Sequence, residues 1–237
     1  MLSFIGMLEG ITALCVVVFN IIFGIFSLIQ AKRKNASLLV NAGFMMIFIG
    51  LLWLGPATDF LLVIITGTNM DNSWGLYGIL SYMWVAPGIT LAMSIGAEVL
   101  APTKKKLIEI IFIGLSVVFE YFLFFRTMES FTFVEPDTPG TELIDSGHNT
   151  GYITFILILV FLISLLIFNG IGFFLKASKT TGVVRKKFLS LSAGFFIFVV
   201  CAAFDSLATP GIGLVFVRLG IIICTLLLYN GLRTKEL

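Results

Sequence analysis

The sequence predicts an all-α integral membrane protein, in which a bundle of seven transmembrane helices forms one domain over residues 1–237. The composition points to this class, because the mean hydropathy is +1.10 and 12% of the residues are charged. Soluble domains carry about 25% charged residues. In addition, seven apolar stretches are long enough to cross a bilayer, since about 20 helical residues span its hydrocarbon core.

The predicted spans follow one another with short polar breaks, apart from one long loop at 126–150. They are expected at 10–31, 38–62, 77–100, 107–125, 151–175, 188–208 and 211–230. The second span contains Pro56, so that either the helix kinks there and projects outward or residues 60–66 lie along the membrane interface. Pro87 allows a similar kink in the third span. The stretch Ala208–Gly211, which contains proline and glycine, predicts the turn before the last span.

The charges give the bundle an orientation. Thirteen of the fifteen lysine and arginine residues fall on one side of the predicted spans: Lys32, Arg33, Lys34, Lys104, Lys105, Lys106, Lys176, Lys179, Arg185, Lys186, Lys187, Arg233 and Lys235. Only Arg126 and Arg218 lie elsewhere, and the loop 126–150 on the opposite side is acidic. Because cytoplasmic loops are enriched in lysine and arginine, we expect the N-terminus outside and the C-terminus in the cytoplasm.

A weak internal repeat links the two halves of the chain. Phe19-Asn20 recurs as Phe168-Asn169, and Ala42–Phe48 resembles Ala193–Phe198 at nearly the same offset. Such matches also arise by chance among helices rich in phenylalanine. If the repeat is real, spans one to three and five to seven are parallel repeats joined by span four, as in some transporters.

This layout of three, one and three helices resembles the microbial rhodopsins, the small seven-helix sugar transporters and, more distantly, the G-protein-coupled receptors. It is also similar to uncharacterised archaeal seven-helix proteins. The resemblance covers the whole chain but not the functional motifs of these families. The stretch 211–230 has no lysine for a retinal Schiff base, span three ends in Glu98-Val99-Leu100 without an arginine, and spans one, five and six contain no proline. The resemblance therefore implies a helical bundle without implying a substrate.

Arg218 is the most informative residue, because a charge inside a span normally faces the bundle interior. On a helical wheel it shares one face with Thr225 and Tyr229. Asp205 lies near the outer end of the preceding, antiparallel span and within reach of Arg218. Either the two residues form an ion pair that fixes the helix register, or they serve function: Arg218 anchors an anionic ligand, or Asp205 couples to protons.

Four further polar or aromatic residues inside the spans have two interpretations each. Asn20 and Asn169 either join helices through hydrogen bonds or contact a substrate at the membrane midplane. Tyr82 and Trp84 either line a cavity beside Pro87 or simply pack against other aromatic side chains.

Glu120 lies five residues from the outer end of span four among aromatic residues. It is expected either to be uncharged through desolvation or to pair with Arg126 or Arg218. His148, the single histidine, is expected to be inert in an exposed acidic loop.

The sequence contains no nucleotide-binding loop, metal-ligand spacing or nucleophile motif. We therefore expect no catalytic residues, no cofactor, no metal site, no enzymatic activity and no binding to nucleic acid. The expected partners are the lipid bilayer of the cell membrane, a small molecule of unknown identity and a signalling partner in the cytoplasm or the membrane.

Two functions remain open. The favoured hypothesis is a receptor or sensor with an outer-half pocket floored by Asp205, Arg218 and Glu120, which signals through the basic segment Arg185-Lys186-Lys187. The alternative is a small-solute transporter or channel with a midplane site between the two repeats. A third possibility is an accessory subunit of a membrane complex.

Overall fold

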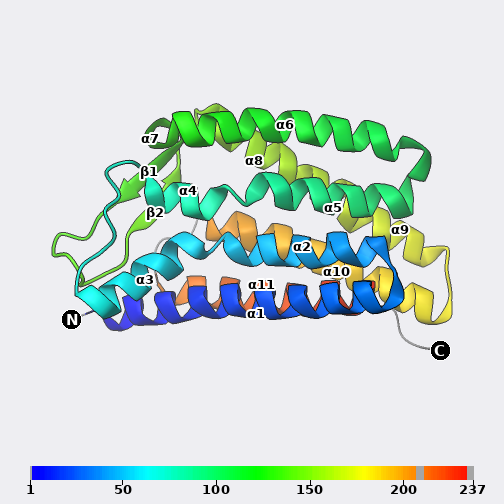
Figure 1. Ribbon diagram of the computed structural model, residues 1–237, viewed down its shortest axis with the longest axis horizontal. Coiled ribbons are helices and arrows are strands. Elements are labelled where there is room, and N and C mark those ends of the chain that lie inside the picture. The colour runs from blue at the N-terminus through cyan, green and yellow to red at the C-terminus, as the bar shows by residue number, and fades with distance from the viewer. Residues whose placement is uncertain (1, 207–210, 234–237) are drawn as a thin grey trace.

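The computed structural model describes residues 2–206 and 211–233 as an elongated bundle of roughly parallel and antiparallel helices (Figure 1). The predicted turn residues Ala208, Thr209 and Pro210, and Lys235, lie outside the described residues. The elements are α1 (Phe4–Lys34), α2 (Ser37–Leu51), α3 (Leu54–Thr66), α4 (Leu76–Tyr82), α5 (Val85–Leu100), η1 (Pro102–Lys104), α6 (Lys105–Phe125), α7 (Thr127–Ser130), β1 (Phe131–Val134), β2 (Asp145–His148), α8 (Ile153–Ser164), the π-helix η2 (Leu165–Ile171), α9 (Gly172–Ser178), α10 (Gly182–Asp205) and α11 (Ile212–Leu232).

The helices indicate a multi-pass membrane protein. Within the described part of the chain, six helices are long and apolar enough to cross a membrane, and the bent pair α2–α3 brings the number to seven if it is one span. Apolar side chains also cover the outside of the bundle, for example Ile110, Val117 and Phe125 on α6, which are 65–72% exposed. Surfaces of this kind are suited to lipid, because soluble proteins rarely expose large continuous apolar patches.

Two helices break four residues before a proline. The pair α2–α3 bends by 50° at Leu52–Trp53, and α4 gives way to α5 at Met83–Trp84. A proline ring clashes with the carbonyl four residues earlier, which places the break at Leu52 for Pro56 and at Met83 for Pro87. The kink therefore precedes Pro56 instead of lying at it, and residues 60–66 continue as regular helix to Thr66.

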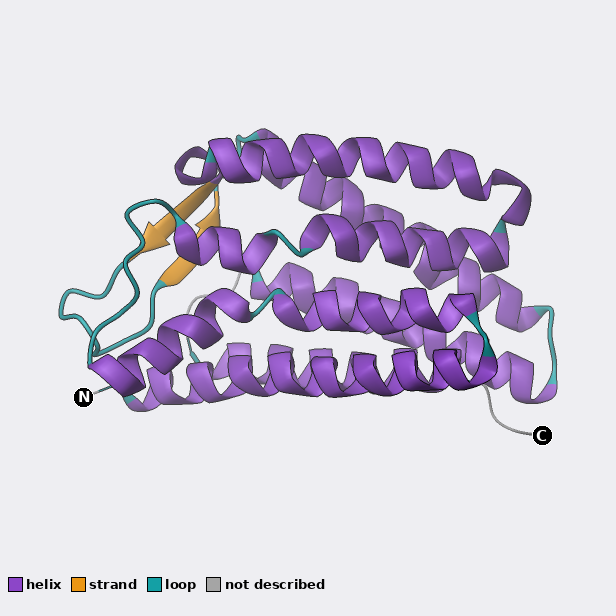
Figure 2. Cartoon of the chain, in the orientation of Figure 1, coloured by secondary structure: helices purple, strands orange, loops and turns teal. Residues whose placement is uncertain are grey.

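The loop 126–150 contains structure that the sequence analysis did not predict. It begins with α7 and then forms an antiparallel pair, in which β1 and β2 are joined in the register Phe131↔His148 to Val134↔Asp145. Figure 2 shows this small sheet at one end of the bundle. We call this end the hairpin end. The opposite end, which carries the clusters Lys32–Lys34, Lys104–Lys106 and Lys176–Lys187, is the basic end.

Six helical segments form a closed ring. Going around it, the contacting neighbours are α1, α2, α5, the η2–α9 segment, α10 and α11, which returns to α1. The helix α6 lies outside the ring against α5 and α8. This arrangement encloses an interior between helices that are distant in sequence.

The basic half of that interior is densely packed. Phe173, Leu191 and Leu228 are at most 3% exposed. The ring of Phe173 stacks on Phe188 and Phe195 at 6.0 Å between ring centres. Gly194 permits the close approach of α10 to Leu228 on α11, because a Cβ at position 194 would lie 2.9 Å from the Leu228 side chain.

Candidate functional site

A cavity of about 150 Å³ occupies the hairpin half of the ring interior. Its walls come from α2–α3, α4–α5, α8, α10, α11 and β2. Its deepest lining residues are Met45, Ala92, Leu165 and Phe195, which lie near the middles of their spans. The cavity thus reaches from the hairpin to about the centre of the bundle.

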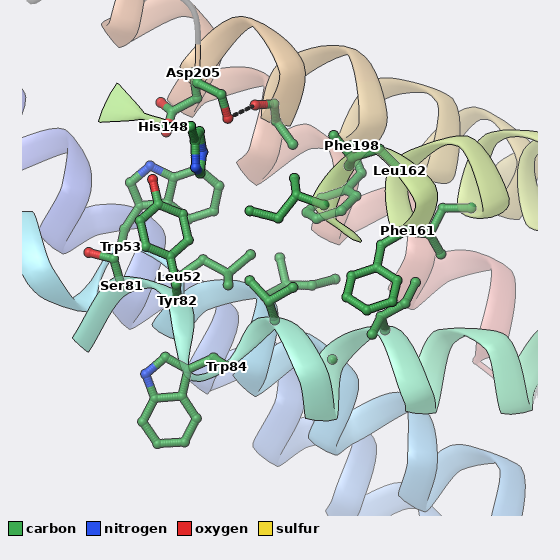
Figure 3. Close-up of a pocket in the computed structure, with 18 of the residues that line it drawn as sticks. Leu52, Trp53, Ser81, Tyr82, Trp84, His148, Phe161, Leu162, Phe198 and Asp205 are labelled. Carbon is green, nitrogen blue, oxygen red and sulfur yellow. Dashed lines mark hydrogen bonds between the residues drawn. The ribbon is translucent and has the colours of Figure 1, made fainter. Parts of the chain in front are cut away.

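The lining is polar at one end and apolar at the other. Figure 3 shows Trp53, Tyr82, His148 and Asp205 gathered at one end, whereas Phe161 and Phe198 lie at the other. The polar end lies toward the hairpin, because His148 belongs to β2. A molecule that fits this cavity needs a polar group on one side and an apolar body on the other.

The cavity lies where the helices are interrupted. Leu52 and Trp53 form the break between α2 and α3, Trp84 lies in the break between α4 and α5, and Leu165 begins the π-helix. Irregular backbone at membrane depth is tolerated where it is buried in protein or lines a cavity, and π-helical turns often occur at functional sites. The helix interruptions therefore support a functional site at this depth in the bundle.

Several buried polar atoms around the polar end have no hydrogen-bond partner. They are Trp53 Nε1, Arg218 Nε, Asp205 Oδ1 and both ring nitrogens of His148. Trp53 and Arg218 are only 4% and 6% exposed, so neither is satisfied by bulk water. Leaving a buried donor or acceptor unpaired costs about 1–3 kcal/mol. The site is therefore suited to bound water or to the polar groups of a ligand.

Arg218 bonds to α1 and not to Asp205. Its Nη1 donates hydrogen bonds to the backbone carbonyl of Glu9 and to Thr12 Oγ1, the latter at 3.2 Å. Asp205 lies within electrostatic range of Arg218, but no ion pair of 4.0 Å or less joins them. The ion pair, one of the two interpretations of these residues, is therefore not formed in the structure. Although α10 is adjacent in sequence, α11 also contacts α1, which offers the acceptors.

Arg218 begins a polar seam between α1 and α11. Further along the same face of α11, Thr225 donates to Asn20 Oδ1 at 2.7 Å, and the Tyr229 hydroxyl accepts from Gln30 Nε2 at 2.6 Å. The shared face of Arg218, Thr225 and Tyr229 predicted from the helical wheel is confirmed, and this face packs on α1. The seam runs from the cavity to the basic end.

Replacing Thr225 by valine tests the middle of this seam. The substitution keeps the shape but leaves the buried Asn20 Oδ1 without its donor, so we expect a loss of about 1 kcal/mol in the free energy of unfolding. Thr154→Val is the matched control, because Thr154 is also fully buried but its hydroxyl has no partner. Thermal unfolding in detergent should rank Thr225→Val below the control. Equal stabilities would show that this bond contributes nothing.

The other predicted midplane residues do not form one site. Asn20 joins α1 to α11, and Asn169 Nδ2 donates to the Ala92 carbonyl at 2.8 Å. Neither is among the residues that line the cavity, whereas Tyr82 and Trp84 are. Tyr82 stacks on Phe131 of the hairpin at 4.3 Å, and the Trp84 indole donates to the Leu80 carbonyl.

Glu120 is separate from this site. It is half-buried on α6, does not line the cavity, and its carboxylate oxygens have no hydrogen-bond partner. Arg126 pairs with Glu129 at 2.6 Å, and Arg218 faces α1. Placing Glu120 on the pocket floor, and pairing it with either arginine, was wrong, because α6 lies outside the ring.

His148 is the functional candidate that the sequence analysis missed. It lines the cavity and packs against Tyr82, Phe131 and Phe155, so the expectation of an inert histidine in an exposed loop is wrong in its placement. Burial lowers its pKa to about 4, which makes the imidazole neutral at neutral pH. The alternating stretch Phe131–Val134 was the one signal for a strand here, and its partner β2 has no apolar pattern.

A second, acidic cavity adjoins the first. It has a volume of about 330 Å³ and lies between the start of α1 and the hairpin loop, and its acidic lining residues are Glu9, Glu135, Asp137, Glu142 and Asp145. Asp145 lines both cavities. Burial raises the pKa of Asp145, and the Ser146 backbone N–H and Arg218 partly oppose this rise. Over residues 2–206 and 211–233, no three His, Cys, Asp or Glu side chains are placed to hold a metal ion.

The predicted partner surface lies at the far end of the bundle. Arg185 and Lys186 are exposed and Lys187 is half-buried, all in the first turns of α10. They are well separated from the cavity, whose lining on α10 begins at Phe195. A signal from one to the other must therefore pass along the helices.

Comparison with known proteins gives no family assignment. No protein-family model matches the chain, and a search of curated proteins finds no match. The cavity and its surroundings are therefore the basis for any functional conclusion.

Proposed function

We propose that the chain is a receptor- or sensor-like seven-helix membrane protein, with its N-terminus outside and its C-terminus in the cytoplasm. It binds a small amphipathic molecule in the hairpin-half cavity and signals through a separate partner at the basic end. The observation that carries this proposal is the buried cavity with unpartnered polar atoms at its hairpin side.

The packed basic half favours sensing over transport. The cavity ends near Ala92, Leu165 and Phe195, and beyond it Phe173, Leu191 and Leu228 fill the interior. A transport path must be polar or gated along its length. A receptor needs a pocket that is accessible from one side only.

The α1–α11 seam offers a route for the signal. Arg218 both lines the cavity and bonds to α1, so a ligand that engages its guanidinium acts on the residue that holds the two helices in register. At the basic half α11 contacts α10 through the hydrogen bond from Ser190 Oγ to the Leu227 carbonyl. A shift of α11 therefore reaches the helix that carries Arg185, Lys186 and Lys187. Small shifts of packed helices are a common switching mechanism.

Filling the cavity tests the binding part of the proposal. Ala202 lines the cavity and its neighbour Ala203 does not, so Ala202→Leu and Ala203→Leu form a matched pair. We expect benzyl alcohol, benzylamine or benzoate to raise the melting temperature of the wild-type protein and of Ala203→Leu, but not of Ala202→Leu. If none of the three probes stabilises the wild type, or Ala202→Leu responds equally, the cavity is not a binding site.

Flux distinguishes sensor from transporter. Proteoliposomes with an imposed membrane potential are given benzyltrimethylammonium or benzenesulfonate, two probes whose permanent charge prevents passive permeation. A sensor takes up neither probe above protein-free liposomes. If either probe accumulates inside the liposomes, and Ala202→Leu abolishes this uptake while Ala203→Leu retains it, the protein is a transporter and not a sensor.

A transporter is the second candidate, because the helix contacts favour the internal repeat. Asn20 of span one bonds to Thr225 of span seven, and the equivalent Asn169 of span five bonds to Ala92 of span three. In the repeat, span one corresponds to span five and span seven to span three. The contact between spans one and seven therefore corresponds to the contact between spans five and three. Parallel repeats about an axis along the membrane normal occur among transporters, with their binding sites near the midplane.

A further inference from the structure

We propose that the ligand of the hairpin-half cavity is a small apolar α-amino acid, a zwitterion whose carboxylate meets Arg218 and Trp53 and whose ammonium meets Asp205. This inference rests on the proposed function, because it names the chemical class bound at the same site. Three features of the lining support it, one for each part of such a molecule.

Two N–H donors are available to bind the carboxylate of the ligand. Arg218 uses Nη1 to bind α1, which leaves Nε without an acceptor, and Trp53 Nε1 makes no hydrogen bond of 3.5 Å or less, although it lies near the Asp205 carboxylate. Both side chains are more than nine-tenths buried and line the same cavity. Two N–H donors, one of them charged, match the two oxygens of a carboxylate, which guanidinium groups bind strongly.

Carboxylates in excess of the basic side chains are available to bind the ammonium of the ligand. Asp205 Oδ1 is unpartnered, and Asp145 lines the same cavity. With Glu9, three carboxylates lie within electrostatic range of one guanidinium. Among the described lining residues the other basic side chain is His148, which is neutral. A ligand that brings a carboxylate alone would add to this negative charge, whereas the ammonium of a zwitterion offsets the charge of its own carboxylate and can pair with Asp205.

The apolar end of the cavity is suited to the side chain of the ligand. Phe161, Leu162 and Phe198 line it. The whole cavity, polar end included, has a volume of about 150 Å³, which is that of an engineered protein cavity that binds benzene. A phenylalanine or leucine side chain has the size for this space. Long or polar side chains do not fit a lining of this chemistry.

The acidic cavity beside the first one suits the approach of such a ligand. Its described lining includes Glu135, Asp137 and Glu142 and contains no lysine, arginine or histidine. Asp145 connects it to the inner cavity. Clefts lined by one sign of charge raise the local concentration of oppositely charged groups. The ammonium end of an amino acid is therefore attracted toward the inner site.

Three probes of nearly equal size test the inference: L-phenylalanine, phenethylamine, which lacks the carboxylate, and 3-phenylpropionate, which lacks the ammonium. Isothermal titration of the detergent-solubilised full chain at pH 7 is expected to show phenylalanine binding at least tenfold more tightly than either analogue. If one analogue binds as tightly as phenylalanine, the charge that it lacks is not recognised and the inference is overturned.

Two conservative variants assign the charges. Trp53→Phe removes one donor and is expected to weaken phenylalanine several-fold and to weaken phenethylamine less, since Trp53 also lies near Asp205. Asp205→Asn is expected to weaken phenylalanine and phenethylamine together and to leave 3-phenylpropionate unchanged or tighter. The matched controls are Trp74→Phe, at a side chain 83% exposed, and Asp71→Asn on the surface, and neither should change any of the three affinities.

The outcomes separate this inference from the proposed function. If the three probes bind with similar affinity and Ala202→Leu abolishes all binding, the cavity is a ligand site but the zwitterion assignment fails. If no probe binds and Ala202→Leu makes no difference, the proposed function fails with it.

Discussion

Replacing Asp59 by alanine is expected to lower the free energy of unfolding by about 3–5 kcal/mol, because the change leaves buried donors around a removed carboxylate. Asp59 is fully buried in α3. Its carboxylate accepts hydrogen bonds from the backbone N–H groups of Met70 and Ile144 at 2.8 and 2.9 Å and from Asn69 Nδ2 at 3.0 Å. Met70 and Ile144 are themselves buried, so water does not replace the lost acceptor.

The damage should be confined to the hairpin end. Asn69 also donates to the Glu142 carbonyl and accepts from the Gly140 N–H, so the Asp59 network fastens the loop between α3 and α4 and the hairpin loop to α3. Hydrogen exchange should therefore increase in residues 67–75 and 135–144 before it increases in the helices of the basic half.

The control for Asp59→Ala is Asp71→Ala. Asp71 is an exposed aspartate whose hydrogen bonds are local, among them one from the backbone N–H of Ser73. Its removal should change the melting temperature little, since surface substitutions are usually within about 0.5 kcal/mol. A melting temperature of Asp59→Ala equal to that of Asp71→Ala would mean that the carboxylate does not hold the loops.

The helices were predictable from sequence because their signal is local. A run of about 20 apolar residues has few alternatives to a membrane span, and the breaks before Pro56 and Pro87 follow from a clash with a carbonyl four residues away. The hairpin was not predictable in the same way. Its strand Phe131–Val134 alternates, but the partner strand Asp145–His148 reads Asp-Ser-Gly-His, which has no β-pattern.

The candidate site was harder to predict from the sequence, because its geometry depends on partners that are distant in sequence. The role of Asp59 has no local signal, since the donors to its carboxylate lie 11 and 85 positions away. Arg218 was paired with the neighbouring helix, whereas its partners belong to α1, more than 200 positions away. The sequence indicated which charges lie in the membrane; their partners depend on how the ring of helices closes.

Replacing Arg218 by methionine is the second change with a large expected effect. Met keeps much of the side-chain length but removes the cation that faces the Glu9 carbonyl and the surrounding carboxylates. Removing one member of a buried charge network typically costs about 3–5 kcal/mol, and we expect a loss in this range. Thermal unfolding in detergent at neutral pH measures it. An unchanged melting temperature would mean that the guanidinium does not hold α1 to α11.

Arg218→Lys and Thr12→Val separate the two roles of Arg218. The lysine keeps the positive charge but loses the planar fork, so it should restore much of the stability lost in Arg218→Met but not the affinity for phenylalanine. Thr12→Val removes one of the two acceptors that α1 offers to Arg218 and does not touch the cavity. It should therefore weaken the seam by about 1 kcal/mol and leave phenylalanine binding intact. If Arg218→Lys instead binds phenylalanine like the wild type, the fork is not used for the carboxylate. Arg218 would then act on the cavity only through its charge and through the register that it sets between α1 and α11.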